Sequence, residues 1–316
     1  MYKEHFGLKE KPFTILPDPD FMYWGRTHQL AFAMLEYGIV NRAGITVITG
    51  EIGCGKTTLI QHLLKKLDPA IEVGLLSNIQ RQRDDLLSWV LHAFGQPHEE
   101  ASHIALFEQL ETFLHDCHRH GRRVILIVDE AQNLELDMLE EMRLLTNILV
   151  DKQQLLQLTL LGQPQLKDLL RRPELVQFAQ RVSSDYHIRR LREPEVSSYI
   201  ETRLAKAGRI VPLFEDETFA RIHRISRGIP RLINIICDTA MVYGYSSSAD
   251  SIGLDIVNEV IADKSKYGVF SYYGKMMAPK ARGPKFEIGK DETSPALVIH
   301  DRRLAQFILS RLKGDG

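Results

Sequence analysis

A glycine-rich segment at residues 50–57 is the part of this sequence whose residue types and spacing most clearly specify chemistry. Its residues, GEIGCGKT, match the pattern Gly-x-x-x-x-Gly-Lys-Ser/Thr at every fixed position. Glycines allow the backbone to curve until successive N–H groups point at one centre, where they can hydrogen-bond phosphate oxygens. We therefore predict a loop that binds the phosphates of a nucleoside triphosphate.

The surrounding sequence favours this interpretation over a glycine-rich turn that binds nothing. A β-branched run at residues 45–49 predicts a buried strand before the loop, and TTLIQHLLKKL predicts a helix after it, whose N-terminus attracts anions. We expect Lys56 to bridge the β- and γ-phosphates and the Thr57 hydroxyl to ligate Mg²⁺. The residues expected to contact ATP are Gly50, Glu51, Ile52, Gly53, Cys54, Gly55, Lys56, Thr57 and Thr58.

Cys54 lies inside this loop, and two interpretations of it are open. A helix N-terminus lowers the pKa of a nearby thiol, so Cys54 could be a redox switch. The alternative, which we favour, is a loop position at which only the backbone matters.

A second acidic site follows the apolar run VILIV at residues 124–128. Asp129 and Glu130 come directly after this predicted strand, at the edge of a parallel sheet where ligands bind. We expect Asp129 to hold Mg²⁺ opposite Thr57, and Glu130 to act as the general base that polarises the attacking water. An acidic pair after a strand is often only a helix cap, but the phosphate loop earlier in the chain favours the catalytic interpretation.

The rest of the chain alternates between patterns typical of strands and of helices up to about residue 193. Near-continuous apolar strands that alternate with helices predict an α/β fold of the P-loop NTPase type, with a five-stranded parallel sheet covered on both faces. The predicted strands are residues 45–49, 71–76, 124–128, 156–161 and 185–188. The predicted helices are residues 27–42, 57–67, 84–94, 104–119 and 136–149.

Beyond residue 193 the strand patterns stop, and a small all-helical lid domain is expected. Its predicted helices are residues 195–207, 216–226, 230–243 and 254–263. The predicted domains are an N-terminal arm and helix at 1–43, a nucleotide-binding domain at 44–192, the lid at 193–263 and a basic, partly extended tail at 264–316. We expect the first 25 residues to be an ordered arm on the main domain, because their aromatic side chains favour burial.

The composition of the chain disfavours several classes of protein. The chain has 316 residues, a formal net charge of −1 and three cysteines that form no C-x-x-C pair. The near-neutral charge gives no general attraction to nucleic acid or anionic membrane, and the cysteine pattern indicates neither a zinc site nor a disulfide framework. With no signal-peptide pattern and no apolar run of membrane-spanning length, we expect a cytoplasmic protein.

Several motifs together resemble a known family. GEIGCGKTT, VILIVDEAQNL, LTLLGQPQL, QRV and RGIPRLIN occur in the order found in AAA+ ATPases related to general secretion pathway protein A (ExeA-like). The resemblance covers residues 1–263 and extends, more distantly, to transposition-helper and origin-recognition ATPases. It implies an AAA+ core followed by a helical lid.

The resemblance also implies three further roles. Gln163 falls at the sensor-1 position, where a polar side chain contacts the γ-phosphate or the attacking water. Arg181 resembles the arginine finger that reaches the nucleotide of a neighbouring subunit in a homo-oligomer, with Arg189 and Arg190 as nearby competitors. Arg231, after Pro230 at a predicted helix start, resembles sensor 2. Each of these positions has a plainer alternative, a turn residue or a surface arginine.

Four functions stay open. The family resemblance favours an oligomeric ATPase that acts on a protein partner in an envelope system for secretion, pilus assembly or exopolysaccharide export. A DNA-binding helper ATPase of the transposition or replication type is the alternative. A nucleotide switch without turnover is disfavoured by Glu130, and a kinase lacks a recognisable substrate-binding insertion. The basic residues that bear on DNA binding are Arg203, Lys206, Arg209, Arg221, Arg224 and Arg227.

The tail permits a further hypothesis of peripheral contact with the inner face of the membrane. A short helix is predicted from Asp301, and basic residues flank its apolar positions, as in helices that lie on anionic membranes or dock into a partner. A tail helix packed on its own domain is the favoured alternative. The basic residues of the tail are Lys275, Lys280, Arg282, Lys285, Lys290, Arg302, Arg303, Arg311 and Lys313.

Overall fold

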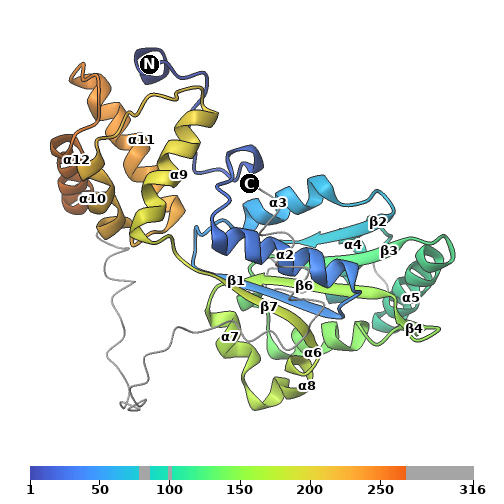
Figure 1. Ribbon diagram of the computed structural model, residues 1–316. Helices are drawn as coiled ribbons and strands as arrows, with labels where there is room; N and C mark the ends of the chain where they lie inside the picture. Colours follow the sequence, from blue (N-terminus) through green and yellow to red (C-terminus); the bar gives the residue numbers. More distant parts are fainter. Residues whose placement is uncertain (78–85, 99–101, 268–316) are drawn as a thin grey trace. The chain divides into compact units, whose positions relative to one another are not determined.

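The computed structural model describes residues 1–77, 86–98 and 102–267 (Figure 1). The chain divides into two compact units. The sheet unit consists of Leu16–Arg190 and Ile229–Arg231, and the helical unit of Met1–Ile15, Leu191–Gly228 and the described part of Leu232–Gly316.

A five-stranded parallel sheet forms the centre of the sheet unit, as predicted. Its order is β2-β3-β6-β1-β7, so β1 lies between β6 and β7, and β6 separates β1 from β3 (Figure 1). Because all its strands are parallel, their carboxyl ends meet at one edge. The strands are β1 (Ile45–Gly50), β2 (Ile71–Leu76), β3 (Arg123–Val128), β6 (Leu156–Gly162) and β7 (Val182–Ile188).

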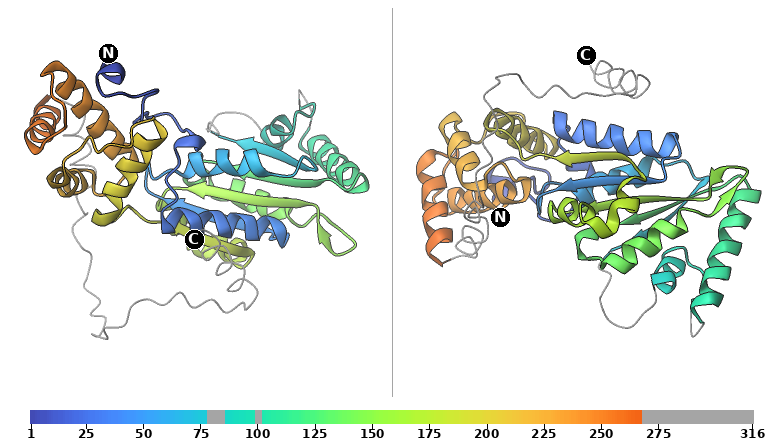
Figure 2. Two further views of the ribbon diagram at one scale, coloured as in Figure 1. Left: turned by 45° about the horizontal axis from the view of Figure 1, so that its top comes forward. Right: turned by 90° about the horizontal axis from the view of Figure 1, so that it is seen from below.

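Helices cover both faces of the sheet (Figure 2). On β3, Val124, Leu126 and Val128 face the core formed with α4 to α8, and Ile125 and Ile127 face the core formed with α2 and α3. This alternation explains why the strand is apolar throughout. The helices are α2 (Arg26–Val40), α3 (Lys56–Lys66), α4 (Leu86–Ala93), α5 (His103–Arg119), α6 (Leu136–Leu145), α7 (Gln165–Leu170) and α8 (Val176–Ala179).

Short elements complete the sheet unit. The helix predicted to run to residue 149 ends at Leu145, because β4 (Leu149–Val150) pairs antiparallel with β5 (Gln153–Gln154). The other short elements are the 3-10 turns η1 (Pro19–Phe21), η2 (Ala131–Asn133) and η3 (Pro173–Leu175).

The helical unit contains the predicted helices after residue 193. The last of them continues to Tyr267, so the segment expected to be tail from residue 264 begins as helix. The helices are α1 (Tyr2–His5), α9 (Glu193–Lys206), α10 (Asp216–Ser226), α11 (Pro230–Ser246), whose first two residues count with the sheet unit, and α12 (Leu254–Tyr267).

The first 15 residues belong to the helical unit, which corrects that part of the expected arm, whereas residues 16–25 lie on the sheet unit as expected. The backbone N–H of Lys9 donates to the carbonyl of Ala207 at 2.8 Å. The buried Arg203 donates from Nε to the carbonyl of Pro12 at 2.6 Å, and Phe13 packs edge-to-face on Phe214. These contacts satisfy backbone carbonyls and bury the aromatic rings within the helical unit.

The predicted helix from Asp301 and all the basic residues named in the tail lie outside the described residues. Among the helices of the described ranges, none combines the length and the apolar character that a bilayer crossing requires.

Two glycines of the helical unit offer a matched test of packing. Gly228 and Gly7 have φ of +71° and +66°, but a methyl group at Gly228 would collide with the backbone of Leu191, whereas one at Gly7 would meet nothing within 4 Å. We expect Gly7→Ala to lower the free energy of unfolding by about 1 kcal/mol, for the left-handed backbone alone. We expect Gly228→Ala to lower it by about 3 kcal/mol or more, because overpacking adds to that cost. Urea denaturation followed by circular dichroism measures the free energy of unfolding of both variants. An equal decrease in Gly7→Ala and Gly228→Ala would contradict the packing argument.

Candidate nucleotide-binding site

The site lies at the carboxyl edge of the parallel sheet, where ligands bind in folds of this type (Figure 1). The segments that follow three neighbouring strands supply its side chains. The glycine-rich loop follows β1, Asp129 and Glu130 follow β3, and Gln163 follows β6. The parallel pairing of these strands therefore places residues that are far apart in the sequence at one edge.

The glycine-rich loop has the curved backbone that its composition predicts. Gly53 and Gly55 have φ of +79° and +96°. A side chain at Gly53 would collide with Arg231, whose backbone N–H donates to the Gly53 carbonyl at 3.1 Å. His28 on α2 supports the loop, because its Nε2 lies 2.8 Å from the carbonyl oxygen of Cys54. The loop is thus held by two segments distant in sequence.

Lys56, the first residue of α3, is buried with only 4% of its surface exposed. Its Nζ donates to the carbonyls of Gly50 at 2.9 Å and Glu51 at 3.2 Å, so the ammonium group lies against the inside of the loop. A buried ammonium among backbone dipoles, at a helix N-terminus, favours a polyanionic ligand. Thr57 and Thr58 follow in the first turn of α3.

Thr57 and Asp129 meet across the sheet edge. The Thr57 hydroxyl donates to Asp129 Oδ2 at 2.9 Å, and Asp129 Oδ1 accepts from the N–H of Glu130 at 2.9 Å. Hydroxyl and carboxylate oxygens are hard ligands of the kind Mg²⁺ prefers, and this ion commonly takes only one or two protein ligands besides phosphate and water. In keeping with this, the described ranges contain no group of three or more His, Cys, Asp or Glu side chains that could enclose a metal. The pair fits Mg²⁺.

Glu130 is held by two amide side chains. Its Oε2 accepts from Gln132 Nε2 at 2.6 Å and from Gln163 Nε2 at 3.0 Å, and its backbone has a left-handed φ of 55°. Burial by itself would raise the pKa of Glu130. The hydrogen bonds from Gln163 and Gln132, together with the charge of Lys56, outweigh burial and hold the pKa below its usual value. The carboxylate is therefore ionised and oriented.

Gln132 is a site residue that the sequence pattern alone did not single out. Its Oε1 accepts from the backbone N–H of Gln163 at 2.9 Å while its Nε2 donates to Glu130. It therefore ties the segment after β3 to the segment after β6. The available signal was an amide side chain two residues after the acidic pair, in DEAQN.

The predicted arginines occupy different positions. Arg231 lies against the loop at Gly53, and Arg190 Nη2 forms an ion pair with Glu51 Oε1 at 2.8 Å. Arg181 precedes β7, whose first residue pairs with the start of β1, and its Nη1 donates to Thr146 at 3.4 Å. The structure thus brings Arg190 and Arg231 to the loop, and places Arg181 at the opposite edge of the sheet.

Cys54 is 1% exposed. Burial raises the pKa of its thiol to about 11, against opposing contributions from the Lys56 charge and from backbone hydrogen bonds. A buried, protonated thiol reacts slowly, so the structure supports the interpretation that only the backbone matters at this position.

Comparison with known proteins agrees with the geometry. A family model described as "AAA domain" matches residues 40–170. The chain is also 39% identical over 253 residues to General secretion pathway protein A of Aeromonas hydrophila, an alignment that covers 80% of this chain and 46% of the relative. The chain carries an AAA domain with the AAA+ P-loop fold. It spans less than half the length of that relative.

Solved structures share the AAA+ fold. The Aeropyrum pernix ORC1 protein in complex with DNA superposes with a TM-score of 0.60 at 16% identity, over 85% of this chain and 73% of that chain. Cdc6p from Pyrobaculum aerophilum superposes with a TM-score of 0.60 at 16% identity, over 78% of this chain and 71% of that chain. At such low identity the likeness concerns the fold alone.

The role of Gln132 in holding Glu130 ionised can be tested directly. We expect Gln132→Leu to raise the pKa of the Glu130 carboxyl, because the charged form loses a hydrogen bond that favours it. Carbon-13 NMR titration of glutamate-labelled protein measures this pKa, with the exposed Gln180→Leu as the control. A Glu130 pKa that is the same in both variants would show that Gln132 does not hold the carboxylate.

Proposed function

We propose that this chain hydrolyses ATP to ADP and phosphate and couples its nucleotide state to the assembly or remodelling of a partner. The observation that carries the proposal is the Glu130 carboxylate, kept ionised by Gln132 and Gln163 next to the Thr57–Asp129 pair. A domain that only bound nucleotide would have no need of an oriented base at this point.

Each residue has a role in this proposal. Mg-ATP supplies the γ-phosphoryl group and the metal charge that offsets its oxygens. Lys56 and the loop N–H groups bind the phosphates, and Thr57 and Asp129 hold Mg²⁺. Glu130 takes a proton from the attacking water while Gln163 orients that water. Arg231 senses the γ-phosphate, and Arg181 stabilises charge at the nucleotide of a neighbouring subunit in a homo-oligomer.

The partner is proposed to be a protein of an envelope system, for secretion, pilus assembly or exopolysaccharide export. Support comes from the 39% identity to a protein named General secretion pathway protein A. Peripheral membrane contact through the basic tail stays part of this proposal.

DNA as the partner is less well supported, because arginines of the helical unit have structural roles. Arg203 is buried and bonded to Pro12, and Arg209 Nη1 donates to the carbonyl of Phe6 at 2.7 Å. Arg221 Nε donates to Asn258 at 2.7 Å. These three guanidinium groups keep their charge, but contacts within the helical unit set their positions. The net charge of −1 adds no general attraction to DNA.

Turnover tests the proposal. We expect Lys56→Ala to lose ATP binding, and Glu130→Gln to keep binding but lose about 100-fold or more in rate, because a general base contributes at least that factor. Steady-state phosphate release, with and without DNA, and binding of a fluorescent ATP analogue measure the two effects. The exposed Glu135→Gln is the matched carboxylate control.

The outcomes separate the alternatives. Binding without turnover under any condition would make the chain a nucleotide switch, and strong stimulation by DNA would favour the helper ATPase. Equal loss of rate in Glu130→Gln and Glu135→Gln would remove the proposed general base.

Action of Arg181 in trans can be tested by mixing variants. We expect Arg181→Ala to bind ATP without turnover, and a mixture with Glu130→Gln to regain part of the rate, because some subunit interfaces then hold an intact Glu130 and an intact Arg181. Arg190→Ala is the control, because Arg190 pairs with Glu51 of its own loop and should not be rescued by Glu130→Gln. Failure of Arg181→Ala to complement would contradict the finger in trans.

A further inference from the structure

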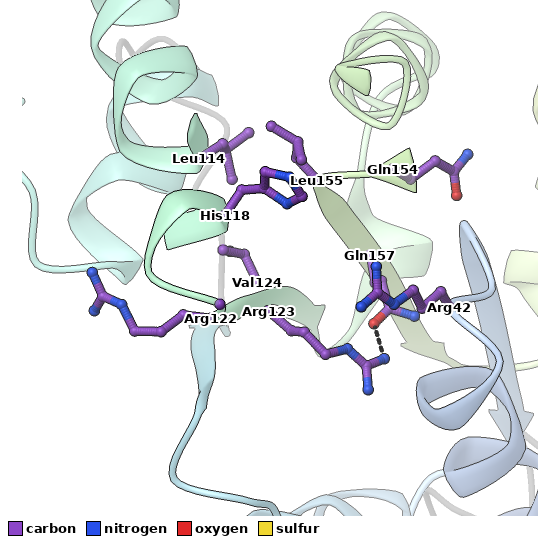
Figure 3. Close-up of a pocket in the computed structure, with 10 residues that line it drawn as sticks. Arg42, Leu114, His118, Arg122, Arg123, Val124, Gln154, Leu155 and Gln157 are labelled. Carbon is purple, nitrogen blue, oxygen red and sulfur yellow. Dashed lines mark hydrogen bonds between the residues drawn. The ribbon is translucent and has the colours of Figure 1, made fainter. Parts of the chain in front are cut away.

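A cavity of about 110 Å³ lies at the edge of the sheet opposite the nucleotide site. Arg42 reaches it from the turn before β1, His118 from the end of α5, Arg123 from the first position of β3, and Gln157 from the start of β6 (Figure 3). Since a strand rises about 3.3 Å per residue, Arg123 and Asp129 at opposite ends of β3 are roughly 20 Å apart. The cavity is therefore separate from the phosphate loop.

Two guanidinium groups face this cavity, and their hydrogen-bond partners among the described residues are neutral. Arg123 Nη2 donates to Gln157 Oε1 at 2.7 Å and to the carbonyl of Ile39, and Arg42 Nη1 donates to the side-chain oxygen of Gln153. Within residues 1–77, 86–98 and 102–267, neither Arg42 nor Arg123 has a carboxylate within ion-pair distance.

Arg122 also lines the cavity, but its guanidinium group has carboxylate partners. It forms an ion pair with Glu72, and its Nη2 lies 3.7 Å from Asp116 Oδ2. Figure 3 shows its guanidinium directed away from Arg123, whereas Arg42, Arg123 and Gln157 direct their polar ends toward one another. Among the described residues, carboxylates thus balance the charge of Arg122, and none lies within ion-pair distance of Arg42 or Arg123.

The fold fixes Gln157, which is the partner of Arg123, and the backbone of the turn that carries Arg42. Gln157 is 5% exposed, and its Nε2 donates to the carbonyls of Gly38 at 3.1 Å and Ala43 at 3.2 Å, which ties β6 to the end of α2 and the turn that carries Arg42. Burial, and secondarily the charge of Arg42, lowers the pKa of Arg123. Each positive charge therefore opposes the other, and an anion between them would offset both.

We propose that this cavity binds a phosphate-sized oxyanion, free or as the phosphate group of a small metabolite, between the guanidinium groups of Arg42 and Arg123. Guanidinium groups present paired donors that match phosphate oxygens. The cavity volume of about 110 Å³ accommodates one such group. The ring of His118 lies beside Leu155 over the same cavity and offers a further donor (Figure 3). Within the described ranges this ring has no hydrogen-bond partner.

Isothermal titration calorimetry tests the proposal with inorganic phosphate and with glycerol phosphate. The full chain is first saturated with Mg²⁺ and a non-hydrolysable ATP analogue, because the phosphate loop also attracts phosphate. We expect saturable binding that is weakened about tenfold or more in Arg42→Gln, because each charged hydrogen bond to the anion contributes on the order of 1.4 kcal/mol or more. Arg42→Lys should lose less, since it keeps the charge without the paired donors.

Controls keep the result interpretable. Arg119→Gln removes an exposed arginine on the same helix as His118 and should bind as the parent chain does. Arg42 is the residue changed in the main test because it hydrogen-bonds one side chain, so its variants are expected to fold. Circular dichroism can verify the fold. Arg123→Gln repeats the binding measurement at the second guanidinium group.

Tighter binding of inorganic phosphate would assign a free anion, and tighter binding of glycerol phosphate a phosphate ester. Equal affinity in the parent, Arg42→Gln and Arg119→Gln would overturn the proposal, and so would binding of an acidic peptide but not of phosphate. Failure of the chain to bind the ATP analogue would contradict the proposed ATPase function. The anion site would still be tested, because phosphate binding by Arg42→Gln can be compared with that of the parent chain.

Discussion

The hydrogen bond between Thr57 and Asp129 depends on the order of the strands more than on either residue. The loop that carries Thr57 follows β1 and Asp129 follows β3, and these strands are not neighbours because β6 lies between them. The two side chains meet only if all three strands are parallel and in the observed register, with Thr49 beside Gly162 and Val128 beside Leu160. A shift of one residue along β6 would turn its side chains to the opposite faces and separate Asp129 from Thr57.

The position of β6 also explains why an amide network surrounds Glu130. Gln163 leaves β6 between the phosphate loop and the acidic pair, so its side chain can reach Glu130. Gln132 closes the network by accepting from the Gln163 backbone. Burial by itself would raise the pKa of this half-buried carboxylate, and the two amide donors with the nearby Lys56 hold the pKa below its usual value. The same central strand therefore positions both the glycine-rich loop and the proposed base.

The sequence was sufficient where chemistry demands particular residue types at a fixed spacing. The curved glycine-rich loop, the position of the acidic pair after β3 and the five strands could be predicted, because a glycine-rich turn and continuous apolar runs are each compatible with few local structures. It was insufficient where contacts join elements far apart in the chain. Gln132, the ion pair of Arg190 with Glu51, and the packing of residues 1–15 on the helical unit depend on which surfaces meet, and local patterns do not encode that. The role of Arg181 in a neighbouring subunit stays a prediction.

Charged residues lie at the two ends of β3 because the interior of this strand is buried on both faces. The interior of β3 is apolar and fully buried from Ile125 to Val128, so the strand can place charge only at its ends. Arg123 stands at one end and Asp129 follows the other. A strand packed on both faces does not slide by fractions of a residue, because its side chains interlock with helices above and below. An anion held by Arg123 would therefore stabilise the position of β3 without moving Asp129. The cavity and the nucleotide site are then expected to bind their ligands independently, unless β3 shifts as a whole against β6.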